Sequence, residues 1–176
     1  GSAIGVKVVA DHVAFVEVGL DGSVLRTASE RFDASATTML SDLVSLTRRF
    51  IDGSTGTRLL GIGVGVPGSV DRQGEGLVVS PQLDWNQTPL GATLRRELQM
   101  PVLVENNVNA LAMAERLYGT GRRHESFLVV TIGTGVGAGI VVDGVVLRGA
   151  AGGAGEVGHT PVLVDGPTCT CGNRGC

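Results

Sequence analysis

The chain opens with two apolar runs that have the composition of β-strands. Segments 3–10 and 13–20 are rich in valine, and a short polar pair separates them. Asp21-Gly22 then favours a turn into a further short apolar run. This pattern predicts an antiparallel meander of strands at the start of a sheet.

Helical periodicity follows the meander. Between residues 37 and 51, apolar side chains recur at the spacing of one helix face, and Asp52-Gly53 is typical of a helix end. Segment 59–66 is almost wholly apolar, which is typical of a strand with both faces buried. The order of these elements indicates an α/β fold.

A second helix is predicted after a Pro67-Gly68 turn and a short glycine-rich hairpin. Thr88 is a suitable cap for this helix, with Pro89 at its first position. Its apolar stripe consists of Leu90, Leu94 and Leu98.

A buried strand over 102–104 and a third helix over 107–118 come next. We expect four residues of this helix to face inward: Leu111, Ala114, Leu117 and Tyr118.

The last third of the chain predicts a second sheet. Segment 121–125 is typical of a linker, 127–132 of a strand, and 138–147 of a hairpin that turns at Asp143-Gly144. A new series of strands after alternating helices and strands predicts two lobes. We expect residues 1–119 to form the first α/β lobe and residues 120–176 to begin the second.

Composition excludes several classes of protein. The 176 residues are 43% hydrophobic with a formal net charge of −3, and the basic residues are scattered, so no nucleic-acid footprint is evident. No apolar run approaches the roughly 18 residues of a membrane span. An odd number of cysteines in one short loop argues against a disulfide scaffold. We therefore expect a soluble, cytoplasmic domain, cut from a longer protein because its Gly1-Ser2 start resembles a cloning remnant.

The end of the chain gathers the residue types that bind zinc. Four candidate ligands are present: His159, Cys169, Cys171 and Cys176. This is the number that a closed tetrahedral zinc site requires. Gly172 and Gly175 can adopt the positive φ angles that bring the last sulfur back to the others. The alternative is three unpaired thiols clustered near a chain end, but the polar residues between them are poor core formers.

A glycine-rich segment at 131–139 has two possible roles. Its candidate phosphate-binding positions are Gly133, Thr134, Gly135 and Gly137. Glycines let backbone N–H groups approach phosphate oxygens, but this segment lacks the lysine of a P-loop and is followed by a predicted strand. A structural turn and a phosphate-type loop therefore both stay open.

Two further segments carry polar groups suited to a ligand. Asn106 and Asn107 follow a predicted strand, where ligands collect in α/β sheets, although asparagine is also a common helix cap. Glu156 stands three residues before His159 and could face a ligand, or it could be a solvated loop glutamate.

Six segments, taken in order, resemble the ROK family of bacterial sugar kinases and sugar-responsive repressors. They are 63–68, 80–85, 104–110, 131–139, 155–159 and 169–176. The resemblance implies an α/β actin-like ATPase (ribonuclease H-like) fold of two lobes, of which the second is incomplete in this chain. It also implies a structural Zn²⁺, a sugar bound in the cleft between the lobes, and a homodimer or homotetramer.

The resemblance also separates the two branches of the family. Its kinases have an aspartate at the position of Asn107, where it accepts the proton of the reacting sugar hydroxyl, and an amide cannot act as that base. Their first phosphate loop, an Asp-x-Gly-Gly-Thr turn, corresponds to segment 7–11, which lacks the two glycines and has Lys7 at the position of the aspartate. We therefore expect no catalytic residues and a regulator's effector domain that binds a monosaccharide or derivative; the alternative is a glucokinase-like, ATP-dependent sugar kinase.

The same resemblance implies which residues contact the sugar. They are Gly68, Asn106, Asn107, Glu156 and His159. Repressors of the family bind DNA through an N-terminal helix-turn-helix domain, which this sequence does not contain. DNA is therefore an expected partner only through a segment outside this chain.

Overall fold

The computed structural model describes residues 1–54, 58–71, 74–133, 135–169 and 171–176. Internal contacts divide the chain into two compact units, Gly1–Asn107 and Val108–Cys176. Within the described residues, no helix is both long and apolar enough to span a membrane. The lobe boundary expected after residue 119 stays a prediction, because contact units and the lobes of a fold need not share limits.

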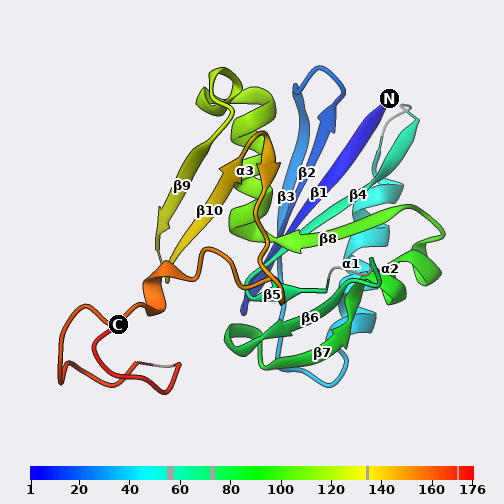
Figure 1. Ribbon diagram of the computed structural model, residues 1–176. Coiled ribbons are helices and arrows are strands. Elements are labelled where there is room, and N and C mark those ends of the chain that lie inside the picture. The colour runs from blue at the N-terminus through cyan, green and yellow to red at the C-terminus, as the bar shows by residue number, and fades with distance from the viewer. Residues whose placement is uncertain (55–57, 72–73, 134, 170) are drawn as a thin grey trace. The chain divides into compact units, whose positions relative to one another are not determined.

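The first unit is built on a five-stranded sheet with the order β3-β2-β1-β4-β8 (Figure 1). Its strands are β1 (Ser2–Val8), β2 (His12–Gly19), β3 (Val24–Arg31), β4 (Leu59–Val66) and β8 (Val102–Asn106). The first three form the predicted antiparallel meander, and β4 and β8 continue the sheet in parallel with β1.

Two helices cover one face of this sheet. In α1 (Met39–Asp52), Leu43 and Phe50 are buried, as the periodicity predicts. In α2 (Leu90–Leu98), Leu90 and Leu94 are buried. These side chains join alternate residues of β1 and β4 in one hydrophobic cluster, which is the core of the unit.

The prediction that β4 and the next strand are buried on both faces is wrong. In β4, Ile62, Val64 and Val66 are buried, whereas Gly63 on the other face is exposed. In β8, Leu103 is 78% exposed. The reason is that, in the part of the chain the structure describes, α1 and α2 pack on one side of the sheet only.

A small sheet of β5 (Ser69–Val70), β6 (Leu77–Ser80) and β7 (Trp85–Pro89) precedes α2, with a 3-10 turn at Pro81–Leu83. Thr88 lies in β7, where it is buried and pairs with Val78, and it does not cap α2. Pro89 is the N-cap residue and Leu90 the first helical residue. The predicted cap is therefore wrong, because strand pairing takes Thr88 away from the helix end.

Glu17 is a carboxylate on the buried face of β2. It is 3% exposed. Its Oε1 accepts hydrogen bonds from Ser54 Oγ at 2.7 Å and Ser2 Oγ at 2.8 Å. Arg26 Nη2 lies 3.3 Å from Oε2. The Ser54 hydrogen bond, followed by that of Ser2, holds the pKa of Glu17 below its usual value.

Helix α3 (Asn107–Tyr118) begins at the last residue of the first unit, and the second unit continues from it into a three-stranded sheet with the order β11-β10-β9. The strands are β9 (Phe127–Ile132), β10 (Val136–Val142) and β11 (Val145–Val146). Asp143 and Gly144 have φ angles of 49° and 73° and turn the chain between β10 and β11, which confirms the predicted hairpin.

The predicted inward face of α3 is wrong. Ala112 is buried, whereas Leu117 and Tyr118 are 54% and 64% exposed; Leu111 and Ala114 are also exposed. The helix turns its small side chains toward β10, where a Cβ on Gly139 would lie 2.7 Å from Ala112 Cβ. Backbones approach this closely only where side chains are small, and packing here overrides the larger apolar stripe.

The expected linker at 121–125 is partly ordered secondary structure. Thr120–Arg123 is a 3-10 turn. Gly121 is buried, and a Cβ there would lie 2.6 Å from Phe127 Cζ. The segment therefore packs on the start of β9, and this prediction is also wrong.

Candidate functional site

Three of the predicted sugar-binding residues lie together at one end of the first unit's sheet. β4 and β8 are parallel neighbours, and Val66 pairs with Asn106. The carboxyl ends of both strands therefore lie side by side, and the Pro67-Gly68 turn and Asn107 follow directly. This is the edge of an α/β sheet at which ligands bind.

A side-chain hydrogen bond joins the two strand ends. Asn106 Nδ2 donates to the carbonyl oxygen of Gly68 at 2.8 Å. Glu105 Oε1 accepts from the backbone N–H of Asn106 at 2.9 Å. The Asn106 amide therefore holds the turn that follows β4.

Gly68 occupies a position that only glycine tolerates. Its φ angle is +94°, and a Cβ there would lie 2.3 Å from the carbonyl oxygen of Val79. The turn is therefore pressed against β6, and its backbone is fixed on one side by packing and on the other by Asn106.

Asn107 is the first residue of α3 and is half-buried. A Cβ on Gly65 of β4 would lie 3.7 Å from Asn107 Cα, an ordinary contact distance. Asn109, the third amide of the segment, is only 2% exposed.

The loop that carries Glu156 and His159 is fastened to β10 of the second unit. Ala138 N–H donates to the carbonyl oxygen of Gly155 at 2.8 Å. Gly155 has a φ angle of +92°, and a Cβ there would lie 1.8 Å from the carbonyl oxygen of Ala138. Sequence reasoning missed this anchor, although the glycine next to Glu156 was a visible signal.

His159 presents its two ring nitrogens to different partners. Nδ1 lies 3.6 Å from Cys169 Sγ. Nε2 lies 4.0 Å from Glu156 Oε2, in an ion pair if the ring is protonated. Both side chains are about half exposed. The histidine therefore links the cysteine cluster to Glu156.

The four predicted metal ligands are brought together. The ligand atoms of His159, Cys169, Cys171 and Cys176 all lie within 4.8 Å of one another, so they could hold a metal ion. Cys171 Sγ and Cys176 Sγ are 3.7 Å apart. The φ angles of Gly172 and Gly175 are +89° and +79°, which confirms the predicted turn geometry.

Backbone contacts hold this loop in shape. Cys169 N–H donates to the carbonyl oxygen of Asn173 at 2.8 Å, and Gly175 N–H donates to that of Pro167 at 2.9 Å. A Cβ on Gly175 would lie 1.8 Å from the carbonyl oxygen of Leu163. The cluster is therefore formed by the fold of the loop itself.

The surroundings of Cys169 and Cys176 shift the pKa values of these two thiols in opposite directions. A hydrogen bond from the backbone of Cys171, followed by its side chain and His159, lowers the pKa of Cys169 to about 6. Desolvation and the neighbouring thiols raise the pKa of Cys176 to about 11. Negative charge on one sulfur thus opposes ionisation of the next.

The glycine-rich segment forms the turn between β9 and β10. Gly133 N–H donates to the carbonyl oxygen of Gly135 at 2.9 Å, so one backbone donor is used within the turn. Gly133 and Gly135 are exposed, and Gly137 is half-buried in β10. Thr134 lies outside the described residues. A hairpin turn is present, and a role in phosphate binding stays a prediction.

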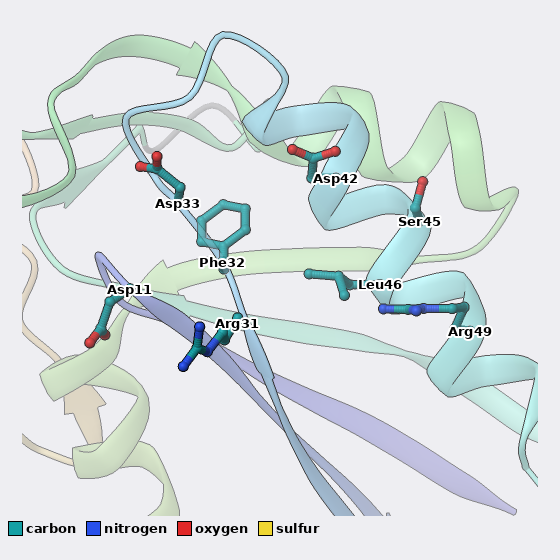
Figure 2. Close-up of a pocket in the computed structure, with 8 residues that line it drawn as sticks. All are labelled: Asp11, Arg31, Phe32, Asp33, Asp42, Ser45, Leu46 and Arg49. Atoms are coloured by element: carbon teal, nitrogen blue, oxygen red, sulfur yellow. The ribbon is translucent and has the colours of Figure 1, made fainter.

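A separate open cavity of about 900 Å³ lies in the first unit, and none of its lining residues was predicted as a site residue. Figure 2 shows Asp11 and Arg31 at one side, residues of α1 at the other, and Phe32 between them. All three of its carboxylates have partners: Asp11 Oδ1 lies 2.7 Å from His12 Nδ1, Asp33 accepts from Ser35 Oγ at 2.7 Å, and Asp42 accepts from Thr38 Oγ1 at 2.7 Å. Nothing in this mixed set of charges selects one kind of ligand.

The architecture is that of the actin-like ATPase fold, in the form found in a glucokinase and a transcriptional regulator of known structure. The model of the ROK family matches residues 3–176. The chain therefore belongs to the ROK family.

Both branches of that family are represented among similar proteins. The xylose repressor of Bacillus subtilis (strain 168) is 30% identical over 179 residues, which cover 100% of this chain and 46% of the repressor. A ROK glucokinase from Streptomyces griseus, solved with glucose and AMPPNP, superposes with a TM-score of 0.87 at 32% identity, covering 100% of this chain and 55% of that chain.

A ROK transcriptional regulator, a homologue of the E. coli Mlc protein, superposes with a TM-score of 0.88 at 29% identity and covers 99% of this chain and 45% of its own. The chain thus spans about half the length of the proteins it resembles. Overall similarity does not separate regulator from kinase.

Proposed function

We propose that this chain is the sugar-sensing part of a ROK-family transcriptional repressor, which binds a monosaccharide or a derivative without phosphorylating it. The observation that carries the proposal is Asn107 at the first position of α3. The family resemblance implies an aspartate at this position in the kinases. An amide has no basic site near neutral pH and cannot accept the proton of a sugar hydroxyl.

The segment that corresponds to the first phosphate loop supports the same proposal. β1 ends at Val8, and the turn into β2 contains Asp11, whose Oδ1 lies 2.7 Å from His12 Nδ1. This carboxylate is exposed and paired with its own neighbour. The turn has no glycines that would let backbone N–H groups surround a phosphate.

The proposal assigns the sugar contacts to five residues: Gly68, Asn106, Asn107, Glu156 and His159. Amides can donate and accept hydrogen bonds, and a carboxylate accepts them, so these groups suit the recognition of sugar hydroxyls. Their partners within each unit hold several of them in place before a ligand arrives, which lowers the entropy lost on binding.

We also infer that the cysteine cluster binds a structural Zn²⁺. A tetrahedron with Zn–S bonds of about 2.3 Å and a Zn–N bond of about 2.1 Å has S–S edges of roughly 3.8 Å and S–N edges of roughly 3.6 Å. The Cys171–Cys176 separation of 3.7 Å and the Cys169–His159 separation of 3.6 Å fit those edges. Four protein ligands would leave no position for a reactive water.

The partners and location follow from the regulator hypothesis. DNA would bind through a helix-turn-helix segment outside this chain, in a homodimer or homotetramer. Sugar would change DNA affinity only if the two states of the protein bind the sugar with different affinity. A reducing cytoplasm would keep the three thiols available for zinc.

Calorimetric titration of the full-length protein against a sugar panel tests the proposal. The panel includes xylose and glucose, and operator DNA binding is measured with and without each sugar. We expect one sugar or derivative to bind and to change DNA affinity. Binding of no sugar or sugar derivative in the panel would contradict the sensor function.

An ATP-dependent sugar kinase is the second candidate. The similarity to the Streptomyces griseus glucokinase favours it, as does the glycine-rich hairpin that joins β9 and β10. A kinase would release ADP continuously when supplied with ATP and its sugar, whereas a sensor would not. Release of ADP is therefore the measurement that separates the two candidates.

A further inference from the structure

Cys171 and Cys176 are placed so that a disulfide could join them. Their sulfur atoms are 3.7 Å apart, and a disulfide bond is about 2.05 Å long, so the two atoms need to approach by less than about 2 Å. Cys171 is exposed, and a small oxidant can therefore reach its sulfur.

The backbone around Cys171 leaves room for this movement. Gly172 follows it with a φ angle of +89°, and no atom lies within 4 Å of the position that a Cβ would occupy there. Glycine tolerates a wider range of backbone angles than other residues, so a small change in the backbone at this position meets little steric resistance. The Cys171 end of the pair can therefore shift toward Cys176.

Cys169 is held more firmly than Cys171. Its N–H donates to the carbonyl oxygen of Asn173 at 2.8 Å, and its own carbonyl accepts from Gly172 N–H at 3.0 Å. Its sulfur lies next to His159 Nδ1. A single residue separates it from Cys171, whereas four residues separate Cys171 from Cys176. The wider loop favours Cys171–Cys176 as the pair that forms a disulfide.

We propose that a peroxide oxidises Cys171 and Cys176 to a disulfide and that this reaction prevents the site from binding its metal. The Cys171 thiolate attacks a peroxide oxygen, the O–O bond breaks, and a sulfenic acid forms with release of hydroxide. The Cys176 thiolate then attacks the Cys171 sulfur, which forms the S–S bond and expels a second hydroxide. Two electrons pass from the sulfurs to hydrogen peroxide, and two protons from solvent complete two water molecules.

The disulfide changes the loop that carries the proposed sugar residues. It removes two of the four metal ligands and leaves His159 and Cys169, which are too few for a closed zinc site. His159 also faces Glu156, so loss of the metal would free both side chains from their fixed arrangement. This inference rests on the proposed zinc site and adds control by oxidants to it.

The test uses full-length protein purified under reducing conditions, with its zinc content measured first. Hydrogen peroxide is added, zinc release is followed with a coloured chelator, and disulfides are mapped by mass spectrometry of peptides. We expect release of one equivalent of zinc in step with a Cys171–Cys176 disulfide. Thiol reductant and added zinc should restore the starting state.

Two single variants test which two cysteines form the disulfide. Cys169→Ser keeps both partners and should still form the Cys171–Cys176 disulfide. Cys171→Ser should lose it. Peroxide that leaves the thiols of zinc-loaded protein reduced, or that yields a disulfide of Cys169 instead, would overturn the inference. Protein that contains no zinc would contradict the proposed metal site, and the disulfide map would still decide the pairing.

Discussion

Asn106 Nδ2 donates a hydrogen bond of 2.8 Å to the carbonyl oxygen of Gly68, across 38 positions of sequence. This bond connects the end of β8 with the turn that follows β4. Both residues belong to the proposed sugar site. The position of the turn at Gly68 therefore depends on the orientation of the Asn106 amide.

Replacing the Asn106 amide should weaken sugar binding. In Asn106→Asp, a carboxylate oxygen takes the place of Nδ2 and cannot donate to Gly68. We expect about tenfold or greater loss of sugar affinity, or roughly 1.4 kcal/mol, measured by calorimetry. Asn86→Ala, which removes an exposed amide of β7, is the control and should bind sugar normally. Unchanged affinity in Asn106→Asp at neutral pH would count against this role.

A side chain at Gly68 should destabilise the first unit strongly. Both Gly68 and Gly74 have positive φ angles, but only at Gly68 would a Cβ collide with the backbone. We expect Gly74→Ala to lower the free energy of unfolding by about 1 kcal/mol and Gly68→Ala by more than about 3 kcal/mol. Urea denaturation of both variants provides the measurement, and equal losses would refute the packing argument.

Glu17 should make stability depend on acid pH. Its pKa in the folded protein is below the usual value of 4.5, so the unfolded chain binds more protons between these two pKa values. Its contribution is therefore present above about pH 4.5 and is lost as the pH falls through the folded pKa.

Glu17→Gln should flatten that dependence. The difference in slope between parent and variant can reach about 1.4 kcal/mol per pH unit for one proton. Urea denaturation over a series of acid pH values measures it. If Glu17→Gln has the same slope as the parent, the assignment to Glu17 is incorrect.

The contact between Gly155 and β10 should be needed for full zinc binding by the cysteine cluster. Gly155→Ala places a Cβ against the carbonyl oxygen of Ala138 and should displace the loop that carries His159. We expect a lower zinc content by elemental analysis. Gly153→Ala is the matched control, because no atom lies within 4 Å of its Cβ position. Full zinc content in Gly155→Ala would show that the loop does not depend on this contact.

Removal of the metal should lower the stability of the second unit, because the proposed zinc is structural and not catalytic. A chelator should lower the melting temperature and weaken the sugar response of the full-length protein, because the loop that carries His159 loses its cross-link. His124→Ala, an exposed histidine outside the cluster, should retain the response to chelator. A melting curve that chelator does not shift would argue against a structural metal.

Elements specified by neighbouring residues could be predicted from the sequence. The helix over 107–118 has the limits of α3, and Asp143-Gly144 forms the expected turn. The cysteine cluster was also predictable, because its three sulfurs lie within one short loop whose glycines permit the turn.

Features that depend on distant partners could not be predicted. The buried face of α3 is decided by Gly139, whose missing side chain admits Ala112 and leaves the larger apolar residues outside. The Asn106–Gly68 hydrogen bond requires the parallel register of β4 and β8. One available signal was overlooked: Glu17 alternates with the apolar Val13 and Phe15, which indicates a carboxylate on the buried face.

The most direct test of the central claim combines sugar binding and ATP turnover in one sample of full-length protein. Calorimetry first identifies a sugar that binds, and a coupled assay then follows ADP release with that sugar and ATP at saturating concentrations. The account predicts sugar binding with no ADP release above the background without sugar. Sustained, sugar-dependent ADP release would contradict it and identify the protein as a kinase.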